Sequence, residues 1–201
     1  MIKHVGYYIN RTDIPGTTVL SIPIANCQRQ CKDCHSPWLK ESNGVDLLTN
    51  LPKLLAKFKD QIGGVCFLGE GNDAPALLEA LKIVREADLD TALYSGADRF
   101  EDISLLYRLS PHFMDCELDF LKIGSNNDLH GDFNDPDTTN QRLYIHNEFG
   151  WQDITINFQS TYEELRAYYK SQLLPCELPG WEPPEETETE SSEEGGKNEI
   201  Q

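Results

Sequence analysis

The order of apolar and polar residues along the chain predicts strands that alternate with helices. Residues 17–24 form an apolar, β-branched run after the Pro15-Gly16 turn, and residues 64–69 form a second short apolar run, as expected of buried strands. Residues 46–59 and 74–87 repeat apolar side chains at the spacing of one helical face. Further strands are predicted at 3–9, 90–94, 114–123, 142–146 and 153–158, and further helices at 100–109 and 161–169.

This alternation is typical of an α/β fold built from βαβ units around a parallel sheet. The units are too few for a complete eight-stranded barrel, which needs about 250 residues, so we expect a partial (βα) barrel with a mostly parallel, curved sheet. A polar or glycine-rich turn follows each of the strands that end at Ile24, Leu68, Tyr94 and Ile123. Parallel strands place their carboxyl ends at one edge of a sheet. The four turns are therefore expected to converge on one face, which favours an enzyme.

Charge is distributed unevenly along the 201 residues. The formal net charge is -17, and residues 177–201 contain nine glutamates against one lysine. After Trp181 this segment has almost no apolar residues, so it cannot bury enough surface to offset its ordering entropy and is expected to be disordered. It is interpreted as a solvating tail, with a docking arm for a basic partner as the alternative. We therefore divide the chain into one domain, 1–176, and a disordered acidic tail, 177–201.

Composition also narrows the expected surroundings of the protein. No apolar run approaches the roughly 20 residues that cross a membrane, and the first residues contain no apolar leader segment. We therefore expect a soluble, cytoplasmic protein without a membrane partner. The acidic balance argues against nucleic acid as a direct ligand, because proteins that bind nucleic acid need basic surfaces.

Three of the six cysteines carry the clearest chemical signal in the sequence. Cys27, Cys31 and Cys34 have the spacing C-x3-C-x2-C directly after the predicted strand at 17–24. Short spacings bring thiolates together around iron–sulfur clusters, and three thiolates leave one iron of a four-iron cluster without a local ligand. Because a metal with an open position can bind a substrate, this loop is a candidate for catalysis.

Two other uses of these cysteines agree less well with their spacing. A structural zinc site would combine the three thiolates with His35, but zinc sites usually pair C-x2-C units far apart, and His35 directly follows Cys34. A disulfide framework is unexpected in a chain without a secretory leader. Cys66, Cys116 and Cys176 lack short spacings and are expected to be buried as small hydrophobic residues.

Four segments together resemble the radical S-adenosylmethionine enzymes and, within them, the activating proteins of anaerobic ribonucleoside-triphosphate reductase. The segments are 27–39, 67–75 with Gly69-Glu70-Gly71, 93–96, and 119–124 followed by 137–144. Together they span about residues 20–146. The cysteine spacing points to the superfamily, and the run Thr-Thr-Asn-Gln-Arg at 138–142 is the most specific pointer to the activating proteins.

The resemblance implies that Cys27, Cys31 and Cys34 hold a [4Fe–4S] cluster whose remaining iron binds S-adenosylmethionine. It implies that an electron from a donor such as flavodoxin cleaves this cofactor to methionine and a 5′-deoxyadenosyl radical. That radical would take a hydrogen atom from one glycine of the anaerobic ribonucleoside-triphosphate reductase, which is the expected partner. The protein itself would contribute orientation, electrostatics and the exclusion of water.

Two positions depart from the pattern of the family. Asp33 stands where an aromatic residue often precedes the third cysteine, so its main chain is expected to bond to the adenine. Gly69 and Gly71 permit a close approach of the backbone to the cofactor, but the motif reads Gly-Glu-Gly instead of Gly-Gly-Glu or Gly-Gly-Asp. Glu70 and Asp73 therefore remain alternatives for the acid that pairs with the amino group of the cofactor, and Asp73 is alternatively a helix N-cap.

Further polar residues complete the predicted site. Ser95 is expected to bond the ribose or carboxylate of the cofactor, unless it serves only its turn, and Lys122 either faces the site or lies at its rim. His35 is expected beside the cluster. Asn140, Gln141 and Arg142 are predicted to dock the reductase or orient the ligand, because they donate several hydrogen bonds, with a structural tie of their own loop as the alternative.

Two alternative functions follow from the same residues. The first is another small radical enzyme that acts on a small molecule, for example in the formation of a deazaguanine ring. The second is a non-catalytic iron–sulfur carrier or zinc-binding protein. A carrier usually needs four protein ligands, so a requirement for Cys66 would favour it.

Overall fold

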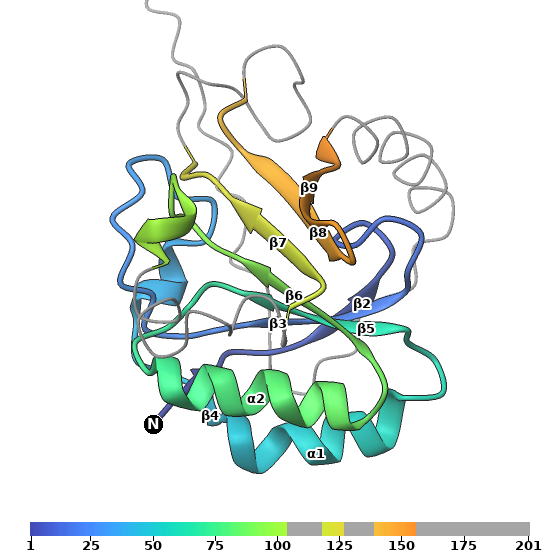
Figure 1. Ribbon diagram of the computed structural model, residues 1–201. Coiled ribbons are helices and arrows are strands. Elements are labelled where there is room, and N and C mark those ends of the chain that lie inside the picture. The colour runs from blue at the N-terminus through green and yellow to red at the C-terminus, as the bar shows by residue number, and fades with distance from the viewer. Residues whose placement is uncertain (104–117, 127–138, 156–201) are drawn as a thin grey trace, which may run out of the picture.

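The computed structural model describes residues 1–103, 118–126 and 139–155 (Figure 1). Several predictions of the sequence therefore lie outside the described residues. They are the strand residues 114–117, the helix at 161–169, most of the helix at 100–109, Cys116, Cys176, and the boundary between the domain and its tail at 177–201.

A seven-stranded sheet forms the centre of the molecule, in the order β2-β3-β5-β6-β7-β8-β9. The strands are β2 (Tyr8–Asn10), β3 (Val19–Pro23), β5 (Gly64–Leu68), β6 (Asp90–Tyr94), β7 (Phe120–Ile123), β8 (Arg142–Asn147) and β9 (Gly150–Asp153). β3, β5, β6 and β7 run parallel to one another, whereas β2, β8 and β9 join antiparallel at the two sides. The predicted α/β class with a largely parallel sheet is confirmed.

Two α-helices, α1 (Leu47–Phe58) and α2 (Ala74–Glu86), connect the parallel strands on the same face of the sheet (Figure 1). Each begins at an aspartate whose carboxylate accepts a hydrogen bond from the first turn. Asp46 accepts from the main-chain N–H of Thr49 at 2.8 Å, and Asp73 accepts from that of Ala76 at 3.2 Å, which satisfies N–H groups that have no partner within the helix. Two short 3-10 helices, η1 (Pro37–Lys40) and η2 (Phe100–Asp102), lie in the loops.

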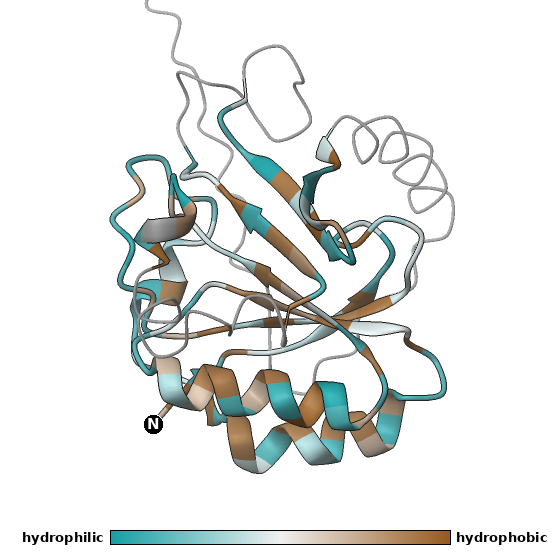
Figure 2. Cartoon of the chain, viewed as in Figure 1, coloured by the Kyte–Doolittle hydropathy of each residue, from teal (hydrophilic) through white to brown (hydrophobic). Residues whose placement is uncertain are grey.

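The two faces of the sheet carry different side chains because successive residues of a strand point to opposite sides. Leu20, Phe67 and Leu93 pack in the main core together with the apolar residues of α1 and α2. Figure 2 shows the apolar residues of both helices in brown. The other face contains a smaller apolar cluster that includes Val19 and Cys66. We call this second face of the sheet, opposite the helices, the inner face. Two rows of paired residues cross it. The first row is Ser21, Cys66, Ala92 and Phe120, and the second, nearer the carboxyl ends of the strands, is Pro23, Leu68, Tyr94 and Lys122.

Two predicted strands differ from those observed. The run 3–9 is split: β1 (Lys3–His4) pairs with β4 (Val45–Asp46) in a separate two-stranded sheet, and β2 starts only at Tyr8. The last strand is predicted at 153–158, whereas the observed strand, β9, covers Gly150–Asp153. Residues 156–158 lie outside the described residues. An Asn147 side chain that accepts from the N–H of Phe149 at 2.9 Å turns the chain early, so β9 starts at Gly150.

Among the described ranges, none of the helices has the length and apolar character needed to cross a membrane.

Candidate functional site

The loops after four strands surround one cavity of about 340 Å³. Its wall includes Cys27, Cys31, Cys34 and His35 from the loop after β3, Gly69 after β5, Ser95 and Gly96 after β6, and Gly124 and Asn126 after β7. The predicted convergence of these loops on one face is therefore confirmed. It follows from the parallel order of β3, β5, β6 and β7, whose carboxyl ends share one edge.

The three cysteines of the motif are free, partly buried thiols that line this cavity. Cys31 packs closely on the end of β6, because a Cβ added at Gly96 would lie 2.8 Å from the Cys31 Sγ. Burial raises the pKa of the Cys27 thiol, and a hydrogen bond with the Arg29 main chain opposes this rise. Within the described ranges, no group of three or more His, Cys, Asp or Glu side chains has the arrangement of a formed metal centre. Three thiols on one cavity wall fit the donor set of an iron–sulfur cluster in kind.

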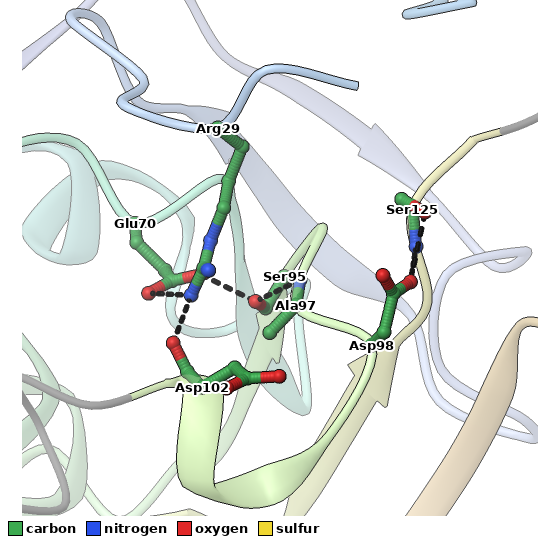
Figure 3. A network of polar contacts seen from close by, with 7 residues as sticks. All are labelled: Arg29, Glu70, Ser95, Ala97, Asp98, Asp102 and Ser125. Carbon is green, nitrogen blue, oxygen red and sulfur yellow. Dashed lines mark hydrogen bonds and ion pairs between the residues drawn. The ribbon is translucent and has the colours of Figure 1, made fainter. Parts of the chain in front are cut away.

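Arg29, between the first two cysteines, joins the cysteine loop to the other loops (Figure 3). Its Nε and Nη2 donate to Glu70 Oε1 and Oε2, both at 3.0 Å, and Nη2 also donates to the main-chain oxygen of Asp102 at 2.6 Å. The hydroxyl of Ser95 donates to Glu70 Oε1, and the N–H of Ala97 donates to Ser95 Oγ at 2.9 Å. We call Arg29, Glu70, Ser95 and the Asp102 main-chain oxygen the Arg29 bracket.

The glycine motif contributes one residue, Gly69, to the cavity wall. Glu70 is engaged by Arg29 and Ser95, and Asp73 caps α2 while its Oδ2 lies 2.7 Å from the Met1 amino group. That hydrogen bond lowers the pKa of Asp73. Gly71 has a φ of 62°, and a Cβ there would lie 2.8 Å from the Ile24 Cγ2. Glu70 and Gly71 thus join the loop after β5 to its neighbours in this structure, and Asp73 serves as the N-cap of α2.

The other predicted cofactor residues are distributed around the cavity. His35 and Lys122 belong to its wall, and the Lys122 Nζ lies 5.0 Å from the centroid of the Tyr94 ring. The main-chain oxygen of Asp33 accepts from the side-chain amide of Asn126, which itself lines the cavity. The loops after β3 and β7 are thereby joined beside the third cysteine.

The three residues predicted to bind a partner separate into different settings. Gln141 lines the cavity, and its Nε2 donates to Asn126 Oδ1 at 3.4 Å. Asn140 donates to the main-chain oxygen of Ser125 at 3.1 Å. The Arg142 Nη1 donates to the main-chain oxygens of Thr139 and Gln141, at 2.7 and 2.8 Å. Asn140 and Arg142 therefore tie their own loop in this structure, which is the alternative that the sequence left open.

Sequence reasoning missed Asp13, which lies in the loop between β2 and β3 and lines the cavity. Its Oδ2 accepts from the Asn10 Nδ2 at 3.0 Å and from the Ser21 hydroxyl, and its main-chain oxygen accepts from the Tyr94 hydroxyl. Burial raises the pKa of the Asp13 carboxyl, and the hydrogen bond from Ser21 opposes this rise. The sequence around Asp13 is typical of a turn and carries no signal of a buried acid.

Comparison of the chain with protein-family models, with curated proteins and with solved structures finds no match.

Proposed function

We propose that the protein is a radical S-adenosylmethionine activase that generates a glycyl radical on anaerobic ribonucleoside-triphosphate reductase. The observation that carries the proposal is the placement of the thiols of Cys27, Cys31 and Cys34 on one cavity wall, at the carboxyl ends of four parallel strands. Open α/β sheets bind ligands at this edge. The finer architecture that we propose is a partial (βα) barrel, whose inner face is the surface next to the cavity.

In this proposal Cys27, Cys31 and Cys34 hold a [4Fe–4S] cluster, and S-adenosylmethionine binds in the cavity beside it. When bound, the cluster supplies an electron and an open iron position for the reductive cleavage of this cofactor, with a donor such as flavodoxin as the source of the electron. The difficult chemistry belongs to the cofactors, and the protein supplies binding, orientation and electrostatics.

The residues of the chain have separable tasks in this scheme. The main chain at Gly69, which has a φ of 92°, approaches the cavity without a side chain in the way. Lys122 and Gln141 add a cation and a neutral amide to the wall, and so can orient carboxylate and hydroxyl groups of a ligand. The apolar wall residues Leu39 and Leu68 exclude water from the same space.

A protein substrate suits a cavity that loops surround at one edge of the sheet. A large partner can cover such a cavity, which favours the reductase over a small-molecule substrate such as a deazaguanine precursor. The activated glycine would enter the cavity as part of a peptide segment.

A structural zinc site is the second candidate, because His35 lines the same cavity as the three cysteines and Cys3His is a common zinc donor set. A four-cysteine electron carrier is less consistent with the structure. Among the cysteines that the structure describes, its fourth ligand would be Cys66, which is fully buried in β5 within the inner apolar cluster. Burial also raises the pKa of the Cys66 thiol well above its ordinary value, which disfavours the thiolate that a metal needs.

Anaerobic reconstitution with iron and sulfide tests the proposal. We expect about four irons per chain, as in a [4Fe–4S] cluster, and a change in the low-temperature paramagnetic resonance spectrum of the reduced cluster when S-adenosylmethionine is added. Alanine at Cys27, Cys31 or Cys34 should abolish loading, whereas the matched control Cys66→Ala should retain it. A chain that takes up one zinc through the three cysteines and His35, and no iron cluster, would establish the zinc site instead.

A further inference from the structure

Arg29 belongs to the cysteine loop, yet the chemistry proposed above assigns it no task. It lies two residues after Cys27 and two before Cys31. Its guanidinium binds the carboxylate of Glu70 and the main-chain oxygen of Asp102 (Figure 3). These contacts connect the loop after β3 with the loop after β5 and with η2.

The geometry of this contact favours one fixed position of the loop. Both carboxylate oxygens of Glu70 receive a guanidinium N–H at 3.0 Å, and the exposed fractions of the Arg29 and Glu70 side chains are 27% and 17%. A two-pronged arginine–carboxylate pair fixes orientation as well as distance, which a lysine cannot reproduce. Partial burial also protects the pair from screening by salt.

The far end of the bracket is fixed as well. Glu70 Oε1 accepts from the Ser95 hydroxyl, and Ser95 Oγ in turn accepts from the N–H of Ala97 at 2.9 Å. The residue between them, Gly96, is where the Cys31 Sγ packs, with 2.8 Å to the position of a Cβ. Arg29 and Ser95, at the two ends of the Arg29 bracket, thus flank the contact between Cys31 and Gly96.

We propose that Arg29 is a positioning residue for Cys31, and that Glu70 acts through Arg29 instead of binding the ligand. The bracket holds residues 27–31 against the end of β6 before any metal or cofactor is present. The inference rests on the proposed function, because the cluster is the group for which Cys31 is positioned. It also separates Glu70 from the amino group of the cofactor, since this carboxylate already holds the Arg29 guanidinium.

Thiol alkylation of the metal-free, reduced protein tests the position of the loop without any cofactor. The modification of Cys31 by iodoacetamide is followed by mass spectrometry. We expect it to be about tenfold faster in Arg29→Gln than in the wild-type protein, because the cysteine loop then opens locally more often. Glu70→Gln should accelerate the modification less, because Arg29 keeps its hydrogen bond to the Asp102 main-chain oxygen, and the double variant should be no faster than Arg29→Gln, because Glu70 acts through Arg29. Arg29→Lys, which keeps the charge on one prong, should fall between. An unchanged rate in Arg29→Gln, or additive effects in the double variant, would overturn the proposal.

Arg99→Gln is the matched control for the loss of an arginine. Arg99 pairs with the side chain of the same Asp102 at 3.1 Å, but its side chain is 73% exposed. This variant should leave the alkylation rate of Cys31 unchanged, and an acceleration equal to that of Arg29→Gln would overturn the assignment to Arg29. Thermal unfolding of each variant confirms that the rates refer to folded protein.

A second measurement separates positioning from ligand binding. Equilibrium dialysis of S-adenosylmethionine against the iron-loaded protein should show a loss of affinity in both Arg29→Gln and Glu70→Gln, and the loss should be no larger in Glu70→Gln. A loss confined to Glu70→Gln would mean that the carboxylate binds the cofactor directly, and would overturn the inference. If the wild-type protein takes up no cluster, the proposed function fails, whereas the alkylation rates still decide whether Arg29 positions the loop.

Discussion

Gly96 provides the sharpest single test of how the cysteine loop is seated. A Cβ at this position would lie 2.8 Å from the Cys31 Sγ and 3.5 Å from the Arg29 Cγ, whereas ordinary contact begins at 3.4 Å. In Gly96→Ala the Cys31 sulfur would therefore have to retreat by about 0.6 Å to restore an ordinary contact. Functional sites tolerate displacements of only about 0.5 Å, so we expect a large loss of cluster loading.

The cost in stability should be modest by comparison. Inserting a methyl group into a packed contact typically costs about 1–3 kcal/mol, and we expect the lower end of that range because Cys31 lies in a loop. Gly63→Ala is a matched control: its Cβ would lie 2.8 Å from the Thr17 Cγ2, and Gly63 and Thr17 are not part of the cavity wall. Both variants should lose similar stability in urea denaturation.

Only Gly96→Ala should lose iron. The assay is the iron content per chain after anaerobic reconstitution, measured together with the urea midpoint of each variant. Full loading of Gly96→Ala would refute the reasoning that the contact with Gly96 sets the position of Cys31. Equal loss of iron in both variants would also refute it, because general destabilisation would then explain the effect.

Two further predictions concern acidic residues that contact the sheet. Burial raises the pKa of Asp13 above its unfolded value. This group therefore favours folding most below the unfolded pKa of about 3.9, and its contribution is lost as the pH rises through the folded pKa. In urea denaturation at a series of pH values, Asp13→Asn should gain stability relative to wild type as the pH rises, and a constant difference would contradict the assignment. Asp119 accepts from the N–H and hydroxyl of buried Thr91, at 2.8 and 3.0 Å, so Asp119→Ala should cost about 2 kcal/mol of unfolding free energy because it removes a charged acceptor from a buried residue. Its control Arg85→Ala removes the partly exposed ion pair with Asp119 but keeps the Asp119 carboxylate beside Thr91, and should cost less than about 1 kcal/mol; equal losses in the two variants would show that Thr91 is not the source.

The parts of the fold that follow from local pattern could be predicted from the sequence. The apolar spacing in α1 and α2 and the short apolar runs of β3, β5 and β6 gave the order of elements and their parallel arrangement. That arrangement then placed the cysteine loop and the turn at Ser95 around one cavity. Periodicity could not assign the partner of each strand, so the division of residues 3–9 between β1 and β2 was missed.

The residues that sequence reasoning missed act through contacts between distant parts of the chain. Arg29 meets Glu70 across 41 positions and Asp102 across 73, and neither position has a local spacing that points to the other. Asp13 lies in a segment typical of a turn, but the fold directs it onto the inner face beside Ser21. The roles of such residues depend on the three-dimensional arrangement of β3, β5 and β6.

Release of 5′-deoxyadenosine tests the central claim most directly. The iron-loaded protein would be mixed with dithionite and S-adenosylmethionine without oxygen, and the nucleoside quantified by chromatography. We predict product from the wild-type protein and from Cys66→Ala, and none from Cys31→Ala. A fully loaded wild-type cluster that binds S-adenosylmethionine but releases no 5′-deoxyadenosine, even with a glycyl-radical reductase present, would contradict the proposed radical chemistry.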